Sequence, residues 1–187
     1  MIYSLLRVTV ALTAFSLCAC AGLTEIEPYR EVACIETVRV SLAGAVQAAE
    51  VEGGKAIDAA YRQPHEMGCI IGEPGYYDVT VLIGAQLSLV SVDAGSGQVE
   101  QRLQQNMFES LGAQSLELAA EGSSSSRIPI ARKNSVTLRE AIGIAERQGG
   151  KALEARTDMQ GGRPGYRVKL VDRGQLHLAW VDGVRPS

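Results

Sequence analysis

The sequence has few of the residues that carry chemistry or recognise nucleic acids. Its 187 residues include two histidines, one tryptophan and two phenylalanines, and aromatic residues make up 5% of the total. So few aromatic side chains argue against a surface that stacks nucleic-acid bases. The net charge is −3, without a run of basic residues. A nucleic acid is therefore not an expected partner.

Recognisable catalytic and metal-binding motifs are also missing. The two histidines, taken with Cys34 and Cys69, have spacings that match no common zinc pattern. No G-x-S-x-G motif occurs, and the serines at 123–126 have no adjacent base that could activate a hydroxyl. Gly53-Gly54-Lys55 follows a predicted helix, so it lacks the donor array with which a helix start binds phosphate. We predict a non-enzymatic protein with no metal, cofactor or small-molecule substrate.

Long hydrophobic runs are confined to the start of the chain. Arg7 is the only charge before Glu25, and the run from Val8 to Ala21 is apolar or small throughout. It is shorter than the roughly 20 residues that span a bilayer. This pattern predicts an export signal peptide at residues 1–20.

The end of this segment favours lipid attachment. Leu17-Cys18-Ala19-Cys20 resembles the lipobox of bacterial lipoproteins, which implies that Cys20 carries a lipid. Because Ala21 follows the cysteine, the resemblance also implies retention at the outer membrane. The alternative is a soluble periplasmic protein cleaved after Ala21, since the preceding residues also fit an A-x-A site.

Two cysteines, Cys34 and Cys69, remain after the signal peptide. An even pair in an exported protein predicts a disulfide. Closing this loop would stabilise the fold by roughly 3–4 kcal/mol. The alternative is two separate buried thiols.

An internal repeat organises the rest of the chain. Ser41–Ala60 aligns without a gap with Thr137–Arg156, and Tyr77–Ala94 aligns with Tyr166–Gly183. Order and spacing are kept, so we predict a duplicated small domain. The predicted boundaries are 30–100 for repeat 1, 101–126 for a linker, partly helical and Ser-rich, and 127–187 for a shortened repeat 2.

Each repeat predicts a helix followed by strands. Apolar residues recur at helical spacing after Ser41 and after Thr137, which are suitable N-caps, and Thr137 with Glu140 forms a capping box. A Gly-Gly pair ends each helix. The alternation then changes to a period of two, typical of strands. The predicted fold is α+β, with two repeats that each pack one helix on a small antiparallel β-meander.

These residues suggest a family. The set resembles the PepSY domain through a helix motif, a Gly-Lys-Ala run, a Tyr-led strand and a closing turn, namely Leu42, Ala45, Val46, Ala49, Glu50, Gly54, Lys55, Ala56, Tyr77, Val92, Asp93, Ala94, Ser96, Gly97, Gln98 and Val99. The second copy matches through Val181-Asp182-Gly183 and then departs. PepSY modules occur in propeptides of thermolysin-like metalloproteases and in secreted bacterial proteins. The resemblance implies a non-catalytic binding or inhibitory module outside the cytoplasm.

Our functional prediction combines these features. We expect a non-catalytic envelope protein, held to the membrane by its lipid alone, that binds and regulates another extracytoplasmic protein such as a peptidase. The alternative is a structural lipoprotein that supports assembly of the envelope. In repeat 2 we expect Leu176, Leu178 and Trp180 to meet the helix. Arg167, Lys169 and His177 would then form a basic docking surface on the open face of the sheet.

Overall fold

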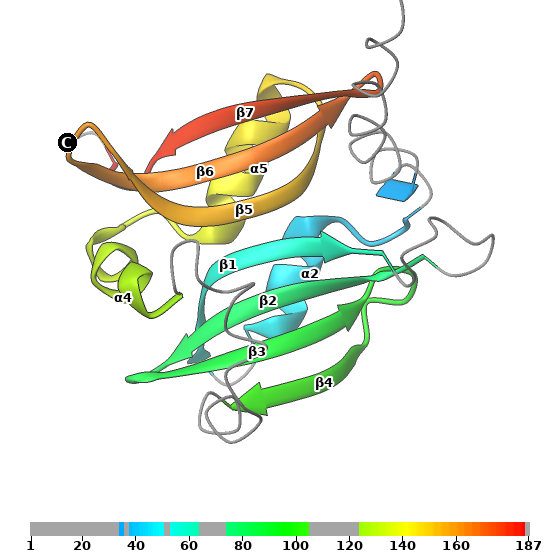
Figure 1. The fold of residues 1–187 in the computed structure, drawn as a ribbon, viewed down its shortest axis with the longest axis horizontal. Coiled ribbons are helices and arrows are strands. Elements are labelled where there is room, and N and C mark those ends of the chain that lie inside the picture. The colour runs from blue at the N-terminus through cyan, green and yellow to red at the C-terminus, as the bar shows by residue number, and fades with distance from the viewer. Residues whose placement is uncertain (1–33, 36–37, 51–52, 64–73, 105–123, 186–187) are drawn as a thin grey trace, which may run out of the picture.

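The computed structural model describes residues 34–35, 38–50, 53–63, 74–104 and 124–185. Within them lies a single antiparallel sheet of seven strands, in the order β4-β3-β2-β1-β5-β6-β7 (Figure 1). The strands are β1 (Lys55–Arg62), β2 (Tyr76–Ile83), β3 (Gln86–Asp93), β4 (Val99–Gln104), β5 (Lys151–Gln160), β6 (Arg163–Asp172) and β7 (Gln175–Asp182).

Helices pack on both faces of this sheet. The helices α2 (Leu42–Ala49) and α5 (Leu138–Gln148) lie on one face of the sheet (Figure 1). Their apolar stripes are buried in the main core. The helix α4 (Ser124–Lys133) lies on the other face, where its Ala131 joins a small cluster with Ile57, Leu82 and Leu87. We call the first surface the helix face and the second the open face.

The predicted helix caps are confirmed. The Ser41 hydroxyl accepts a hydrogen bond from Gly44 N at 3.1 Å. At α5, Thr137 Oγ1 accepts from Glu140 N at 3.2 Å, and Glu140 Oε2 accepts from Thr137 N at 2.8 Å. This reciprocal pair is the predicted capping box, and it satisfies backbone donors that a helix start leaves unpaired.

The prediction of two modules, each with one helix on its own meander, is wrong. β1 pairs with β5 in an antiparallel ladder that includes Ala59 opposite Ala155, so all seven strands form one sheet. Both of these alanines are fully buried in the main core. Pairing the first strands satisfies two edges that separate modules would expose to water or to other chains. The core is therefore shared across the β1–β5 junction.

Two lysines further join the two halves of the sheet. Lys55 Nζ donates to the Ala131 and Asn134 carbonyls, at 2.7 and 3.0 Å, in the segment before α5. Lys151 Nζ donates to the Ile35 and Val38 carbonyls, at 2.8 and 3.0 Å, before α2. Each lysine of a Gly-Gly-Lys motif thus satisfies carbonyl groups in the opposite half. Burial lowers the pKa of the Lys55 ammonium, although nearby Glu50 partly opposes this.

Other motif residues are structural as well. The Tyr77 hydroxyl donates to the Val40 carbonyl at 2.7 Å, and the Tyr166 hydroxyl donates to the Val136 carbonyl at 2.6 Å. Burial raises the pKa of Tyr166 to about 12, so its hydroxyl remains a donor near neutral pH. The tyrosines therefore attach the segment before each helix to the sheet.

The predicted linker differs from expectation. The linker was predicted to begin at residue 101 and to be partly helical, but residues 101–104 belong to the strand β4 (Val99–Gln104), which pairs with β3. The serines at 124–126 were predicted as flexible linker and instead begin α4. Residues 105–123 lie outside the described part of the chain.

Candidate functional site

The orientation of β7 sets which residues reach each face of the C-terminal half. Ala179 lies opposite Val168 and Val181 lies opposite Tyr166, and both partners are fully buried. Because opposed residues of an antiparallel pair share a face, Ala179 and Val181 belong to the helix face. Leu178 belongs to the open face, where it is 68% exposed. The prediction that Leu178 and its alternate neighbours meet the helix is therefore wrong.

The predicted docking residues do not form one surface. Arg167 and Lys169 alternate along β6 and share the open face, opposite Trp180 and Leu178. His177 lies opposite the buried Leu170, on the helix side. Arg167 also makes an ion pair with Asp158 of β5. The basic surface proposed from the sequence is thus reduced to Arg167 and Lys169.

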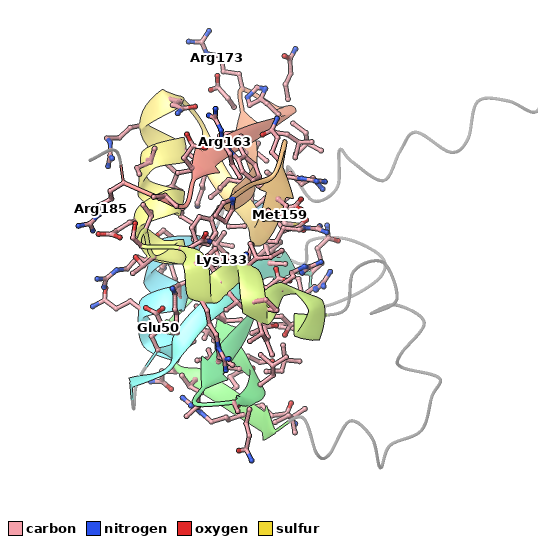
Figure 2. The ribbon with its side chains drawn as sticks, turned by 90° about the vertical axis from the view of Figure 1, so that its left-hand side faces the viewer. Glu50, Lys133, Met159, Arg163, Arg173 and Arg185 are labelled. Carbon is pink, nitrogen blue, oxygen red and sulfur yellow. The ribbon has the colours of Figure 1, made fainter. Side chains whose placement is uncertain are left out.

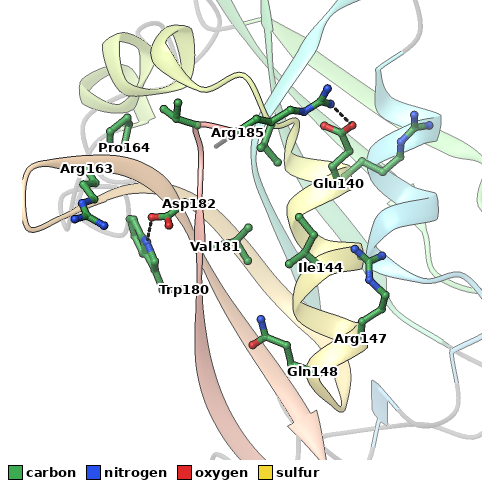
Figure 3. A pocket seen from close by; sticks show the side chains of 14 residues that line it. Glu140, Ile144, Arg147, Gln148, Arg163, Pro164, Trp180, Val181, Asp182 and Arg185 are labelled. Carbon is green, nitrogen blue, oxygen red and sulfur yellow. Dashed lines mark hydrogen bonds and ion pairs between the residues drawn. The ribbon is translucent and has the colours of Figure 1, made fainter. Parts of the chain in front are cut away.

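A groove lies beside the C-terminal end of β7. It has a volume of about 1040 Å³ and separates this strand from α5, and side chains of both elements line it (Figure 3). The half-buried Ile144 of α5 and Val184, which follows β7 and is 52% exposed, supply apolar surface within it, whereas Val181 is buried. Trp180, Arg163 and Pro164 line the part beside β6 (Figure 3). We call this feature the α5–β7 groove.

Basic side chains predominate at the rim of the groove. It carries four arginines and two carboxylates, a formal balance of +2, in a chain with a net charge of −3. The charged residues are Arg139, Arg147, Arg163, Arg185, Glu140 and Asp182. Arg173 and Arg185 project outward from the C-terminal half in the side view of Figure 2. The groove is thus a local basic site on an acidic protein.

Both carboxylates of the rim already have partners. Glu140 Oε1 accepts from Arg185 at 2.8 Å, and Asp182 Oδ1 accepts from Trp180 Nε1 at 3.0 Å (Figure 3). Among the described residues, no ion pair engages Arg139, Arg147 or Arg163. The guanidinium groups of these arginines can therefore bind an anionic group without first breaking an ion pair within the protein.

Trp180 is held against the backbone beside the groove. A Cβ atom placed on Gly165 would lie 2.4 Å from Trp180 Cζ2, so the indole packs directly on this glycine. Trp180 is the only tryptophan of the chain. Its fluorescence is consequently a built-in reporter of the groove.

The two edges of the sheet differ. β7 has eight residues, and its ladder with β6 has no irregularity. β4 has six, and its ladder with β3 is interrupted between Ser91 and Val92. β4 also carries Glu100 and Arg102, whereas Asp182, the last residue of β7, is its only acidic or basic residue apart from His177. Short length, a bulge and charges protect an edge from pairing, and β7 has little of this protection.

The cysteine predictions are only partly within the described residues. Cys34 is buried and disulfide-bonded. Cys69 and Cys20 lie outside the described residues, so their pairing and lipidation stay predictions. Within the described part of the chain, no cluster of histidine, cysteine or carboxylate residues could hold a metal ion. No described helix has the length and apolar character needed to cross a bilayer.

An ionic contact on the open face involves α4. Asp58 of β1 pairs with Arg127 of α4, and these side chains are only 20% and 12% exposed. Burial raises the pKa of Asp58, while Arg127 and then Arg156 oppose the shift. Because Asp58 is held by an arginine and has no nearby hydroxyl or thiol partner among its described contacts, we assign it a structural role.

The predicted turn after β3 is also present. Asp93 Oδ1 accepts hydrogen bonds from the backbone and hydroxyl of Ser96, both at 2.6 Å. The Ser96 hydroxyl is the main cause of a lowered Asp93 pKa. These contacts form an Asx turn between β3 and β4.

Comparisons with known proteins give little guidance. No family model matches the chain, so the resemblance to the PepSY family is unsupported. No curated protein matches it. Among solved structures, it is similar to a putative lipoprotein from Clostridium difficile 630 at 14% identity and a TM-score of 0.38, over 80% of this chain and 90% of that chain. So distant a likeness carries no argument about function.

The α5–β7 groove was missed from the sequence. Its arginines are dispersed over α5, the start of β6 and the segment after β7, so no basic run marks them. One signal was available: α5 presents Arg139, Gly143 and Arg147 at four-residue spacing, a stripe beside the apolar face. The second signal was that the repeat stops matching after Gly183, so the sequence indicates no counterpart of β4 beside β7.

Proposed function

We propose that this chain is a non-catalytic, exported envelope protein that binds another polypeptide through the α5–β7 groove. The observation that carries the proposal is the groove itself, with apolar surface at Ile144 and Val184 beneath a basic rim. Apolar anchor sites surrounded by polar rims are typical of protein-binding surfaces. Binding there would restrain the partner, and regulation of an extracytoplasmic peptidase is one form that this restraint could take.

The repeated motifs support a binding role over catalysis. The Gly-Gly-Lys lysines and the strand tyrosines hydrogen-bond to backbone carbonyls, so they are committed to holding the sheet together. A catalytic site needs a nucleophile or acid within reach of an activating group. The charged side chains of the groove are instead mostly arginines, which suit recognition of anionic groups.

Recovery of partners from solubilised envelopes tests the proposal. We compare the wild type with a groove variant, Arg147→Glu/Arg163→Glu, and an open-face variant, Arg167→Glu/Lys169→Glu. The variant Arg132→Glu/Lys133→Glu, on the exposed surface of α4, is the matched control for a change of four charge units. We expect the wild type and control to recover the same proteins and the groove variant to lose them.

Other outcomes reject parts of the proposal. Loss from the open-face variant alone would assign binding to Arg167 and Lys169 and reject the groove. If no protein depends on either surface, the binding role is wrong and a structural lipoprotein of the outer membrane becomes the better explanation. A peptidase assay with and without recovered partners then decides whether binding inhibits.

We further propose that Cys20 carries the lipid that keeps this protein in the envelope, facing the periplasm from the outer membrane. The support is the lipobox-like sequence Leu17-Cys18-Ala19-Cys20. A labelled fatty acid should mark the wild-type protein but not Cys20→Ser. An unlabelled wild type cleaved after Ala21 would instead identify a soluble periplasmic protein.

A further inference from the structure

The two halves of the sheet end differently beside equivalent helices. In the N-terminal half, α2 covers β1–β3, and β4 is added outside β3. In the C-terminal half, α5 covers β5–β7, and no described strand lies outside β7. Within the described part of the chain, β7 is thus the positional counterpart of β3, and no strand pairs with its outer edge.

β4 shows what a strand at this position contacts. It pairs with β3 through five registered positions, and Arg102 Nη2 reaches the Ala49 carbonyl at the end of α2, at 3.4 Å. The last turn of α2 has no basic residue of its own. A basic side chain of the added strand therefore occupies the negative end of the helix.

At β7 an added strand would need acidic side chains, in contrast to the basic Arg102 that β4 supplies beside α2. The last turn of α5 already contains Arg147, whereas Arg163 lies on the other side of β7, toward the open face (Figure 3). A strand added here would place its helix-face side chains between α5 and the edge of the sheet. Acidic side chains at those positions would meet Arg139 and Arg147 of α5, which make no ion pair with another described residue, while small apolar ones would cover Ile144.

The same charges disfavour a second copy of this chain as the occupant. Pairing β7 with β7 of another copy would bring the two basic rims together around a twofold axis. Like charges at close range oppose such an interface. An acidic, extended segment of a different polypeptide has no such conflict.

We propose that β7 is a strand-addition site, which accepts an extended acidic segment of the partner as an eighth strand of the sheet. This inference rests on the proposed binding function and specifies its mode. Backbone hydrogen bonds to β7 supply affinity, and the groove arginines select acidic side chains on alternate residues of the added strand.

A peptide titration of the full-length protein in detergent tests this inference. The probe is an acetylated eight-residue peptide of alternating valine and glutamate. One control replaces glutamate with lysine, and a second is N-methylated at two adjacent central amides, which blocks both edges of an added strand. We expect a saturable change in Trp180 fluorescence with the acidic probe, weakened at least tenfold by either control change.

Hydrogen exchange locates the contact. Amides of β7 that do not donate to β6 should exchange quickly in the free protein and slowly with the acidic probe. The variant Arg147→Glu/Arg163→Glu should weaken probe binding on the order of tenfold, and Arg132→Glu/Lys133→Glu should leave it unchanged.

Each contrary result has a distinct meaning. Equal binding of the N-methylated probe, or no saturable binding, overturns strand addition even if envelope partners still depend on the groove. Equal binding of the lysine probe overturns charge selection. If β7 amides are protected before any probe is added, the edge is already occupied and the inference is wrong. Dependence of that protection on protein concentration would then identify a second copy, and independence an intramolecular segment.

Discussion

β3 and β7 follow equivalent helices and hairpins, yet one is covered by a further strand and the other borders a groove. β3 is paired on both sides, and its residues Val90 and Val92 are fully buried. β7 is paired on one side among the described residues, and its Leu178 is 68% exposed. The same local sequence plan therefore yields an inner strand in one half and an edge in the other.

This difference indicates which surfaces of the protein can bind a partner. Residues shared by both halves, such as Lys55 and Lys151, are bound to backbone carbonyls and hold the fold. The features that distinguish the C-terminal half are the groove arginines and an edge strand, β7, with a regular ladder and few charges. Function is therefore best sought in what the halves do not share.

The largest difference in stability between equivalent substitutions in the two halves should come from replacing Arg127. Asp58 pairs with this residue of α4, whereas the equivalent Glu154 pairs with Arg156, two residues away on its own strand. Arg127→Met leaves Asp58 buried with weaker compensation, so we expect a loss of about 3 kcal/mol at pH 7. Arg156→Met, at a more exposed pair, should lose about 1 kcal/mol.

The pH dependence of this loss follows from Asp58. Burial raises the pKa of this carboxyl group in the folded protein. Its contribution to stability is then complete below the unfolded pKa and is lost as pH rises through the folded value. Removing Arg127 raises the folded pKa further, so the destabilisation should shrink from pH 7 to pH 4. Urea unfolding at both pH values measures this, and a loss that grows in acid would contradict it.

The next effect tests whether the halves unfold together. Lys55→Met and Lys151→Met each leave two carbonyl groups of the opposite half without their charged donor. We expect each to lose about 2 kcal/mol. The whole sheet should still unfold in one transition. Trp180 fluorescence reports the C-terminal half and far-ultraviolet circular dichroism reports the whole, so separated curves would show two independent units.

The sequence predicted the local elements better than their assembly. Apolar spacing and caps located α2 and α5, and alternation located the strands other than β4, because these signals depend on neighbouring residues. The pairing of β1 with β5 joins segments almost a hundred residues apart, and nothing in either strand specifies it. The alanines that meet there, Ala59 and Ala155, fit an edge strand or an inner strand equally well.

The face of β7 was mispredicted for a related reason. We assumed that its largest apolar side chains would meet the helix. The helix face of α5 is lined partly by alanine, as at Ala141 and Ala145, so the helix lies close to the sheet. The facing residues of β7 include Ala179, which suits this narrow space, while Leu178 is left on the open face.

Helix capping should give a smaller contrast between the halves. Thr137→Ala removes the hydroxyl that accepts from Glu140 N in the α5 capping box, and we expect a loss of about 1 kcal/mol. Ser41→Ala removes the single cap bond of α2 and should lose about half as much. Thermal unfolding compares the two variants. An equal or larger effect of Ser41→Ala would mean that the reciprocal box adds nothing here.

The smallest effect on stability should come from substitutions on the two edge strands. Such substitutions test association with other strands separately from folding. Leu178 and Val99 are exposed residues of β7 and β4, at 68% and 41% exposure. Replacing either with glutamate should change the free energy of unfolding by no more than about 0.5 kcal/mol. A charged side chain on an edge strand opposes pairing with another strand, and glutamate also repels the acidic probe. Leu178→Glu should therefore weaken binding of the acidic strand probe and reduce light scattering on heating, while Val99→Glu should change neither. Equal behaviour of the two variants would mean that the edges are equivalent, and that their different lengths, ladders and charges do not control pairing.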